Sequence, residues 1–294
     1  AEVVHFGDQQ VFENATTYTC LLFLDKASRD KVRIEKVTDL GHWRATGVST
    51  EGSVLADHIT GGAWTFDIGS EGDLLGRLGQ FPAKLGDLTQ IFVGVQTSAD
   101  PVFILSLRKE DDDTLQVFSK AANAEFAIER GIVRPLLKGA DIRRFHVDNP
   151  ANVILYPYQI AAGSASLMEE SELRRSYPLA WQYLTRVRPL LEAREGGKWR
   201  VPQWWQFGRN QNIAEMGKRK LVTQVLASHA SFTADIDGTY CFVGGGNAGG
   251  YGISMMSSSR MSDLYILGLL NSPLLDMYLK SVSTPFRGGY FSYA

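Results

Sequence analysis

The sequence IFVGVQTSADPVFIL, at residues 91–105, is the stretch that decides the fold class. It contains two apolar runs, residues 91–95 and 102–105, on either side of a polar turn at residues 96–101. Short apolar runs bracketed by turn residues are typical of buried strands, so this stretch predicts a β-hairpin. A strand-rich domain is therefore expected around it.

Further elements are predicted toward the C-terminus. Apolar runs at residues 153–156 and 220–226 predict strands, and residues 232–243 predict a second hairpin. Between the two strands, residues 168–194 predict a helix with Pro178 at an interruption or in a first turn. These elements give the domain a helical middle.

A closing helix is predicted at residues 263–279, where leucine and isoleucine recur at core spacing and residues 271–273 form a bend. The predicted fold class is therefore mixed α/β (α+β): a strand-rich domain with a helical middle and a C-terminal helix.

The N-terminal part is expected to form a separate domain. Residues 3–6 and 18–24 predict two buried strands, and a glycine-bearing connection then leads into a short helix at residues 74–78. We place the boundary so that the domains are residues 1–60 and 61–294. Because the chain begins within a strand, we expect it to be a piece of a longer protein.

Composition narrows the class of protein. The chain has 294 residues with 44% hydrophobic content, enough to bury a core, and contains no uncharged apolar run near the roughly 20 residues of a membrane span. Without a secretory signal either, a soluble cytoplasmic protein is expected. The chain has only two cysteines, Cys20 and Cys241, and this number excludes a disulfide framework and a multi-thiolate zinc site. Both are expected to be buried thiols.

Positive charge is concentrated in residues 174–220. This segment has eleven lysines and arginines against three glutamates, a net charge of +8 in a chain whose net charge is −2. Such segregation suits contact with phosphates along one stripe, and the alternative is a solvated helix face.

A glycine-rich run matches the GxGxxG pattern at residues 244–249. Dinucleotide-binding sites need a helix directly after the glycines, whereas Tyr251 and the residues after it continue in an extended style. The run is expected to be a bulge, or a flexible loop whose bare backbone approaches a sugar–phosphate chain. The residues of this loop are Gly244, Gly245, Gly246, Asn247, Gly249 and Gly250.

Catalytic and metal motifs are missing from the sequence. The five histidines have no metal-ligand spacing, and there is no Walker loop, GxSxG motif or magnesium-binding nuclease motif. Nor is there an Asn-Pro-Pro-Tyr-type loop that would hold a flipped adenine. We therefore expect no catalytic residue, no metal and no cofactor in this chain.

Several segments, in this order, resemble the specificity region of TaqI-like and Eco57I-like adenine-specific DNA methyltransferases, a family that includes fused type II restriction–methylation enzymes. The resemblance spans roughly residues 85 to 290. The segments are residues 91–103, 128–145, 155–158, 217–222 and 267–274. In addition, residues 5–26 resemble the last strands of the family's methyltransferase core, so residues 1–60 are expected to be its C-terminal remnant.

This resemblance implies sequence-specific recognition of duplex DNA. The chain would position DNA for base flipping by an upstream methyltransferase domain, and S-adenosylmethionine would bind to that domain of the parent enzyme. Whether the parent also cleaves DNA is left open. The alternative is a protein-interaction or scaffold domain of a phage-defence system, which a broad apolar surface patch would favour over a positive cleft.

The candidate DNA contacts fall into two groups, because lysine and arginine suit phosphates whereas amide, arginine and aromatic side chains suit bases. The phosphate candidates are Lys218, Arg219, Lys220, Arg143, Arg144 and Arg287. The base-reading candidates are Gln203, Gln206, Arg209, Asn210, Gln211, Trp204 and Trp205. The alternatives are core packing for the tryptophans and an exposed pair on a helix end for Arg143 and Arg144.

Overall fold

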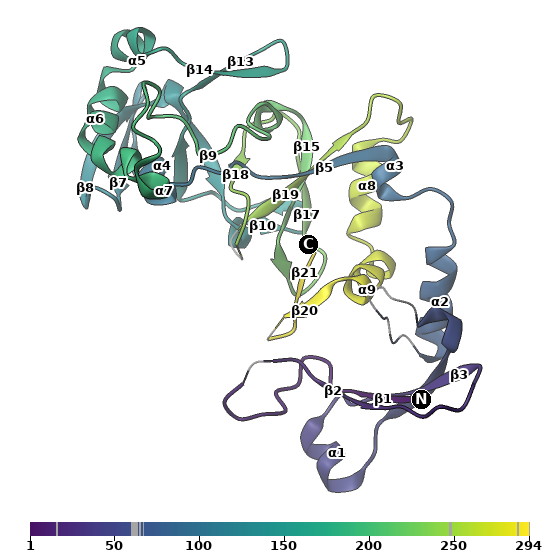
Figure 1. Ribbon diagram of the computed structural model, residues 1–294. Coiled ribbons are helices and arrows are strands. Elements are labelled where there is room, and N and C mark those ends of the chain that lie inside the picture. The colour runs from purple at the N-terminus through teal and green to yellow at the C-terminus, as the bar shows by residue number, and fades with distance from the viewer. Residues whose placement is uncertain are drawn as a thin grey trace. The chain divides into compact units, whose positions relative to one another are not determined.

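The structure is a computed structural model that describes the chain apart from residues 16, 60–63, 65, 67, 247–248, 287 and 294. The side chains of residues 58, 70 and 71 also lie outside the description. Helices and several sheets alternate along the chain, which confirms the predicted mixed α/β class (Figure 1). No helix in the described part is long and apolar enough to cross a membrane.

The chain folds into two compact units. The first unit comprises Ala1–Lys84, Leu226–Ala230 and Ser272–Ala294, and the second comprises Leu85–Val225 and Ser231–Asn271. Both units thus combine segments that are distant in sequence. The single boundary after residue 60 lies at residues outside the description and stays a prediction.

The first unit contains a four-stranded sheet in the order β2-β1-β3-β4. Its strands are β1 (Glu2–His5), β2 (Cys20–Phe23), β3 (Lys31–Lys36) and β4 (Thr50–Leu55). Its helices are α1 (Leu40–Thr46) and α2 (Gly69–Gly79). Val3, Val32 and Ile34 form part of its core.

The strand predicted at residues 18–24 exists as β2, but it is not buried. β2 lies at the edge of the sheet, and all four of its residues are exposed. Cys20 is therefore an exposed thiol, contrary to the prediction, whereas Cys241 is buried as predicted. An apolar run fixes the strand but does not show whether another layer covers it.

The C-terminal segment of the first unit continues from helix α9 (Pro273–Val282) into a small sheet of order β16-β21-β20. The strands of this sheet are β16 (Leu226–Ala227), β20 (Thr284–Phe286) and β21 (Tyr290–Ser292).

The second unit is built on two larger sheets, of six and four strands. The six-stranded sheet has the order β18-β9-β12-β6-β7-β8, and the four-stranded sheet has the order β17-β15-β19-β5. The first contains β6 (Ile104–Glu110), β7 (Thr114–Ser119), β8 (Ala124–Glu129), β9 (Val133–Leu137), β12 (Asn152–Leu155) and β18 (Cys241–Phe242). The second contains β5 (Thr89–Val93), β15 (Lys220–Gln224), β17 (Phe232–Asp235) and β19 (Gly250–Met255).

Smaller elements connect these sheets. They are α3 (Leu85–Leu88), α4 (Asp100–Phe103), α7 (Arg194–Gly197), and the strand pairs β10 (Ile142–Arg143) with β11 (His146–Val147) and β13 (Tyr158–Ala161) with β14 (Ser164–Leu167).

The predicted helices are confirmed. The helical middle consists of α5 (Glu170–Ser176) and α6 (Pro178–Glu192), with Pro178 in the first turn of α6. The closing helix bends as predicted, because α8 (Asp263–Leu270) ends before Asn271 and α9 starts at Pro273.

Both predicted hairpins are wrong. Strands β5 and β6 belong to different sheets, because the helical turn α4, with Pro101 in its first turn, separates them and the chain does not return beside β5. Strands β17 and β18 also separate: the Asp235 carboxylate accepts the backbone N–H groups of Thr239 and Tyr240, and β18 then pairs in parallel with β9.

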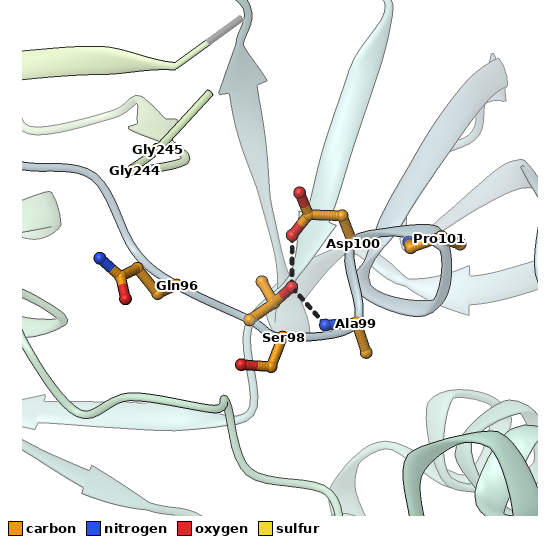
Figure 2. A pocket seen from close by; sticks show the side chains of 8 residues that line it. Gln96, Ser98, Ala99, Asp100, Pro101, Gly244 and Gly245 are labelled. Carbon is orange, nitrogen blue, oxygen red and sulfur yellow. Dashed lines mark hydrogen bonds between the residues drawn. The ribbon is translucent and has the colours of Figure 1, made fainter. Parts of the chain in front are cut away.

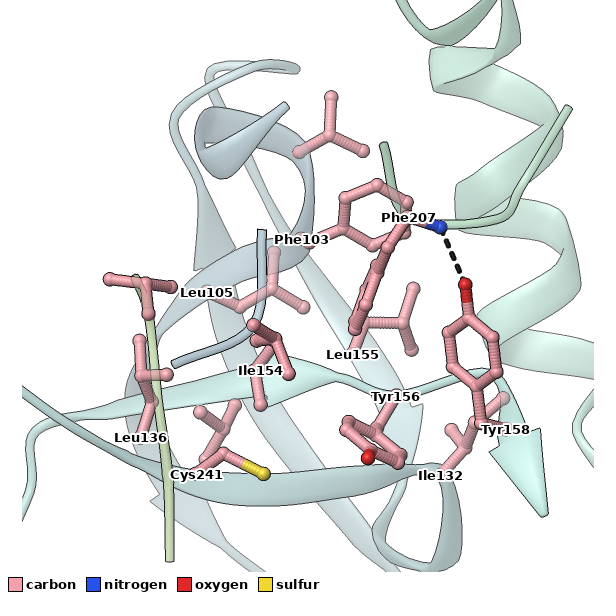
Figure 3. Close-up of a cluster of buried hydrophobic side chains, with 14 of the residues drawn as sticks. Phe103, Leu105, Ile132, Leu136, Ile154, Leu155, Tyr156, Tyr158, Phe207 and Cys241 are labelled. Carbon is pink, nitrogen blue, oxygen red and sulfur yellow. Dashed lines mark hydrogen bonds between the residues drawn. The ribbon is translucent and has the colours of Figure 1, made fainter. Parts of the chain in front are cut away.

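The core of the second unit lies around the six-stranded sheet (Figure 3). Cys241 lies there among apolar and aromatic side chains, and burial raises the pKa of its thiol to about 12. The Tyr158 hydroxyl accepts a hydrogen bond of 2.7 Å from the Phe207 backbone N–H. This bond connects β13 to the loop at residues 203–211, which carries the base-reading candidates.

Candidate DNA-binding surface

Most of the positive charges in residues 174–220 have acidic partners. Six of the eleven form ion pairs: Arg174 with Glu170, Arg188 with Glu192, Arg209 with Glu195, Lys218 with Glu215, Arg219 with Asp263, and Lys220 with Asp235. Within the described part of the chain, four exposed cations of this segment have no ion pair: Arg175, Arg186, Lys198 and Arg200. The segment's net charge therefore overstates the charge that is available to a ligand.

Lys220 was predicted to contact phosphates, and the structure contradicts this prediction. Its side chain is 0% exposed, and Nζ lies 2.5 Å from Asp235 Oδ2 and donates to the Met216 carbonyl at 2.7 Å. A charge buried in this way needs its partner, since the protein interior does not solvate it. Lys220 therefore anchors β15 and cannot meet a phosphate in this structure.

Lys218 and Arg219 remain at the surface. Lys218 Nζ lies 2.6 Å from Glu215, and Arg219 binds Asp263 through two hydrogen bonds of 2.5 and 3.0 Å. The hydrogen bonds from Arg219 hold the pKa of the Asp263 carboxyl below its usual range. Arg219 thus ties the start of β15 to the first turn of α8.

The remaining phosphate candidates differ in placement. Arg143 is exposed and lies 3.0 Å from Asp148, and Arg144 donates a hydrogen bond of 2.5 Å to the Asn271 carbonyl. The Asn271 side chain in turn bonds both the N–H and the C=O of Phe232 on β17. Arg287 lies outside the described residues.

Trp204 and Trp205 were predicted to read bases, but both belong to the core, so this prediction is wrong. Trp204 and Trp205 are buried, and their rings pack at 5.5 Å from the Trp181 ring. The Trp205 ring N–H donates to the Met168 carbonyl at 3.2 Å. Neither ring is accessible to a base.

Other base-reading candidates lie at the surface of the same loop. Gln203, Arg209, Asn210 and Gln211 are exposed, and Gln206 is half-buried. The loop is therefore anchored by its aromatic residues and presents its polar residues to solvent.

Arg194 fixes the position of this loop. Its buried guanidinium donates four hydrogen bonds, to the carbonyls of Leu191, Thr97, Gln206 and Trp204, at 2.7 to 3.1 Å. Burial lowers the pKa of Arg194 to about 10, so it stays charged at neutral pH. Arg194 thereby ties the loop at residues 203–211 to the turn at residues 96–101, alongside backbone hydrogen bonds from Gly208 to Thr97 and from Arg209 to Gln96.

A hollow of about 500 Å³ lies beside this turn (Figure 2). It is lined by residues 96–101 together with Gly244 and Gly245, and we call it the turn pocket. Its volume falls within the roughly 300–1,000 Å³ of ligand sites. Thr97 Oγ1 bonds the Asp100 carboxylate and accepts the Ala99 N–H at 3.0 Å, which fixes the shape of the turn.

Two glycines allow neighbouring chain segments to lie close to the turn and to the residues just before it. A Cβ on Gly244 would lie 2.5 Å from the Gly94 carbonyl oxygen, and one on Gly208 would lie 1.9 Å from Ser98 Oγ. Ser98 itself has a φ of +53°, a strained conformation of the kind that clusters at functional sites.

The glycine-rich run leads into a strand, and Gly250, which was predicted as part of a loop, is the first residue of β19. Gly249 N–H bonds the Gly246 carbonyl at 3.3 Å, and Gly250 then begins β19. No helix follows the glycines, and Asn247 lies outside the described residues. Among the residues that the structure describes, no group of three His, Cys, Asp or Glu side chains could hold a metal ion.

Comparison with known proteins adds the family. Residues 134–293 match the TaqI-like C-terminal specificity domain, which is more than half of the chain. The chain belongs to this family. It is also 26% identical over 306 aligned residues to the type II restriction enzyme and methyltransferase RM.Eco57I of Escherichia coli. That alignment covers 99% of this chain and 30% of the relative, so the chain spans about a third of that protein's length.

The turn pocket combines residues inside and outside the part matched to the TaqI-like specificity domain. Gly244 and Gly245 lie within the match, and residues 96–101 precede it. The sequence gives residues 96–101 only as a turn, so Gln96, Ser98 and Asp100 are missing from its candidate list. The signal in the sequence is the six-residue segment without large apolar side chains, residues 96–101, between two apolar segments.

Proposed function

We propose that this chain recognises a DNA sequence as the specificity region of a restriction–modification adenine-N6 DNA methyltransferase. The observation that carries the proposal is its membership of the TaqI-like specificity domain family, together with similarity along its whole length to a restriction enzyme and methyltransferase.

The chemistry of base methylation explains why a separate reading surface is useful. A base inside a duplex must be flipped out before it is modified, so another surface has to hold the DNA in register. In this proposal, an upstream methyltransferase domain binds S-adenosylmethionine and carries out the reaction, and residues 1–60 continue its core. The chain supplies phosphate contacts for affinity and base contacts for sequence choice.

The surface chemistry of the second unit supports this role. Four exposed cations have no ion pair in the described part of the chain and can bind phosphates without breaking one. They are Arg175, Arg186, Lys198 and Arg200. Lys218 and Arg143 are also exposed, and their surface ion pairs could be exchanged for phosphates at little cost.

The test is the affinity of the chain for duplex DNA over a range of salt concentrations. Each neutralised phosphate contributes about −0.9 to the slope of log affinity against log salt. We expect a slope of about −3.6 or steeper, corresponding to about four contacts or more. A flat response, or no binding at low salt, would overturn the proposal.

A second candidate function, a protein-interaction domain, is favoured by the exposed strand β2. Leu22 and Phe23 on this edge strand are about half exposed, and Leu24 directly after it is 72% exposed. Apolar edge strands are sites of strand pairing with other chains. In the DNA-reading proposal, this strand meets the methyltransferase domain; a stable complex with an unrelated partner and no DNA affinity would favour the scaffold function instead.

A further inference from the structure

The turn pocket contains a polar side chain that the rest of the fold does not use. Gln96 is half-buried at the edge of the pocket, and its amide makes no side-chain hydrogen bond within the described residues. Figure 2 shows the Gln96 side chain pointing away from Asp100, whose carboxylate bonds Thr97. A half-buried amide without a partner is available to a ligand.

Arg209 lies next to Gln96 on the neighbouring chain segment. The two residues form an antiparallel bridge, in which the Arg209 N–H donates to the Gln96 carbonyl at 3.1 Å. Residues directly opposite in such a bridge project from the same face, with Cβ atoms about 5 Å apart. Successive base pairs are about 3.4 Å apart, so two long side chains with this spacing can reach adjacent base pairs.

The guanidinium of Arg209 is available despite its ion pair. The side chain is 53% exposed, and Nη1 lies 3.1 Å from Glu195 Oε1. Exposed pairs of this kind are weak, so a guanine edge can replace the glutamate.

The charge of the pocket favours a base over a phosphate. Asp100 is exposed and lines the pocket, and its carboxylate would repel a phosphate group. Base edges instead carry amino groups, which amide and carboxylate oxygens accept. Ser98, also exposed in the pocket, can donate or accept.

We propose that Gln96 and Arg209 determine specificity at two adjacent base pairs, with the Gln96 amide binding an adenine and the Arg209 guanidinium binding a guanine. The inference rests on the proposed function and refines it. The assignment follows from donor and acceptor patterns, because glutamine pairs with adenine N6 and N7 and arginine with guanine O6 and N7.

The test is selection of preferred sequences from random duplex DNA by the wild-type chain and by variants. Gln96→Ala should lose preference at one base pair by about 5- to 150-fold, with unchanged affinity for non-specific DNA. Arg209→Ala should do the same at the adjacent pair. Gln96→Glu should shift the preference at the first pair from adenine toward cytosine, because a carboxylate accepts from the cytosine amino group.

Matched controls separate reading from folding. Gln182→Ala changes an exposed glutamine on α6, and Arg108→Ala changes an exposed arginine on β6; both variants should select the wild-type sequence. Thermal unfolding should show that Gln96→Ala and Gln96→Glu fold like the wild type.

Each outcome distinguishes the inference from the function on which it rests. A wild-type chain that selects a sequence, with Gln96 variants that select the same one, overturns the inference and leaves the proposed function standing. Variants that weaken all sequences alike also overturn it. A wild-type chain that binds no DNA, or selects no sequence, overturns both.

Discussion

The basic segment at residues 174–220 and the turn pocket differ in how well the sequence indicates which side chains can bind a ligand. The segment attracts attention by its eleven cations, yet six of them are paired with carboxylates and Arg194 is buried against four carbonyls. The turn at residues 96–101 has no positive charge, yet it lines a pocket with an amide that has no hydrogen-bond partner among the described residues. Charge in a sequence indicates how many groups there are, and only the fold shows which of them are free.

Lys220 gives the sharpest test of this contrast. Lys220→Ala leaves Asp235 buried without its partner, which should lower the free energy of unfolding by about 3–5 kcal/mol. Denaturant unfolding of the purified chain measures this. The double change Lys220→Met with Asp235→Leu removes both charges and should recover much of the loss, although Asp235 also caps a turn.

If Lys220 were a phosphate contact, its replacement by alanine would weaken DNA binding and leave stability unchanged. That result would contradict the structural role of this side chain.

Arg175 and Arg186 test the other side of the contrast, the cations that remain available. The double change to alanine should weaken binding to all duplexes alike and reduce the slope of the salt dependence by about 1 for each phosphate that is no longer neutralised. Stability should hardly change, because both side chains are exposed. Arg174→Ala, which removes a paired cation from the same region, is the control and should have the smaller effect. Equal effects from paired and unpaired arginines would show that pairing does not decide availability.

Arg219 is expected to give the smallest effect, through pH. Its hydrogen bonds lower the pKa of Asp263, so the pair stabilises the fold above the unfolded-state pKa of about 3.9 and loses this contribution as pH falls through the lower folded-state value. Arg219→Ala should therefore lower the unfolding midpoint slightly at neutral pH and by less near pH ~3. Thermal melts at several pH values measure this, and a difference that grows as the pH falls would contradict the assigned pair.

Much of the fold was predictable, because local patterns fix local elements. The interruption at Pro178 and the bend at residues 271–273 were predicted correctly, since proline limits the backbone wherever it occurs. The two hairpins were not, because strand pairing depends on contacts distant in sequence. β5 pairs with β19, which lies far along the chain, and no local pattern indicates that partner.

The candidate site was predictable only in part for the same reason. Arg209 was identified from its residue type, whereas Gln96 gains its significance from the bridge to Arg209 and from the pocket that it lines. Trp204, Trp205 and Lys220 have suitable chemistry for DNA, but their burial depends on packing that the sequence does not display.

The measurement that tests the account most directly is the ratio of the chain's affinities for its selected duplex and for a scrambled duplex of equal length at physiological salt. Specific DNA-binding proteins bind their sites at least about 10³-fold more tightly than other sequences, and we expect a preference of this kind. Equal affinities for the two duplexes would contradict the claim that this chain reads DNA sequence.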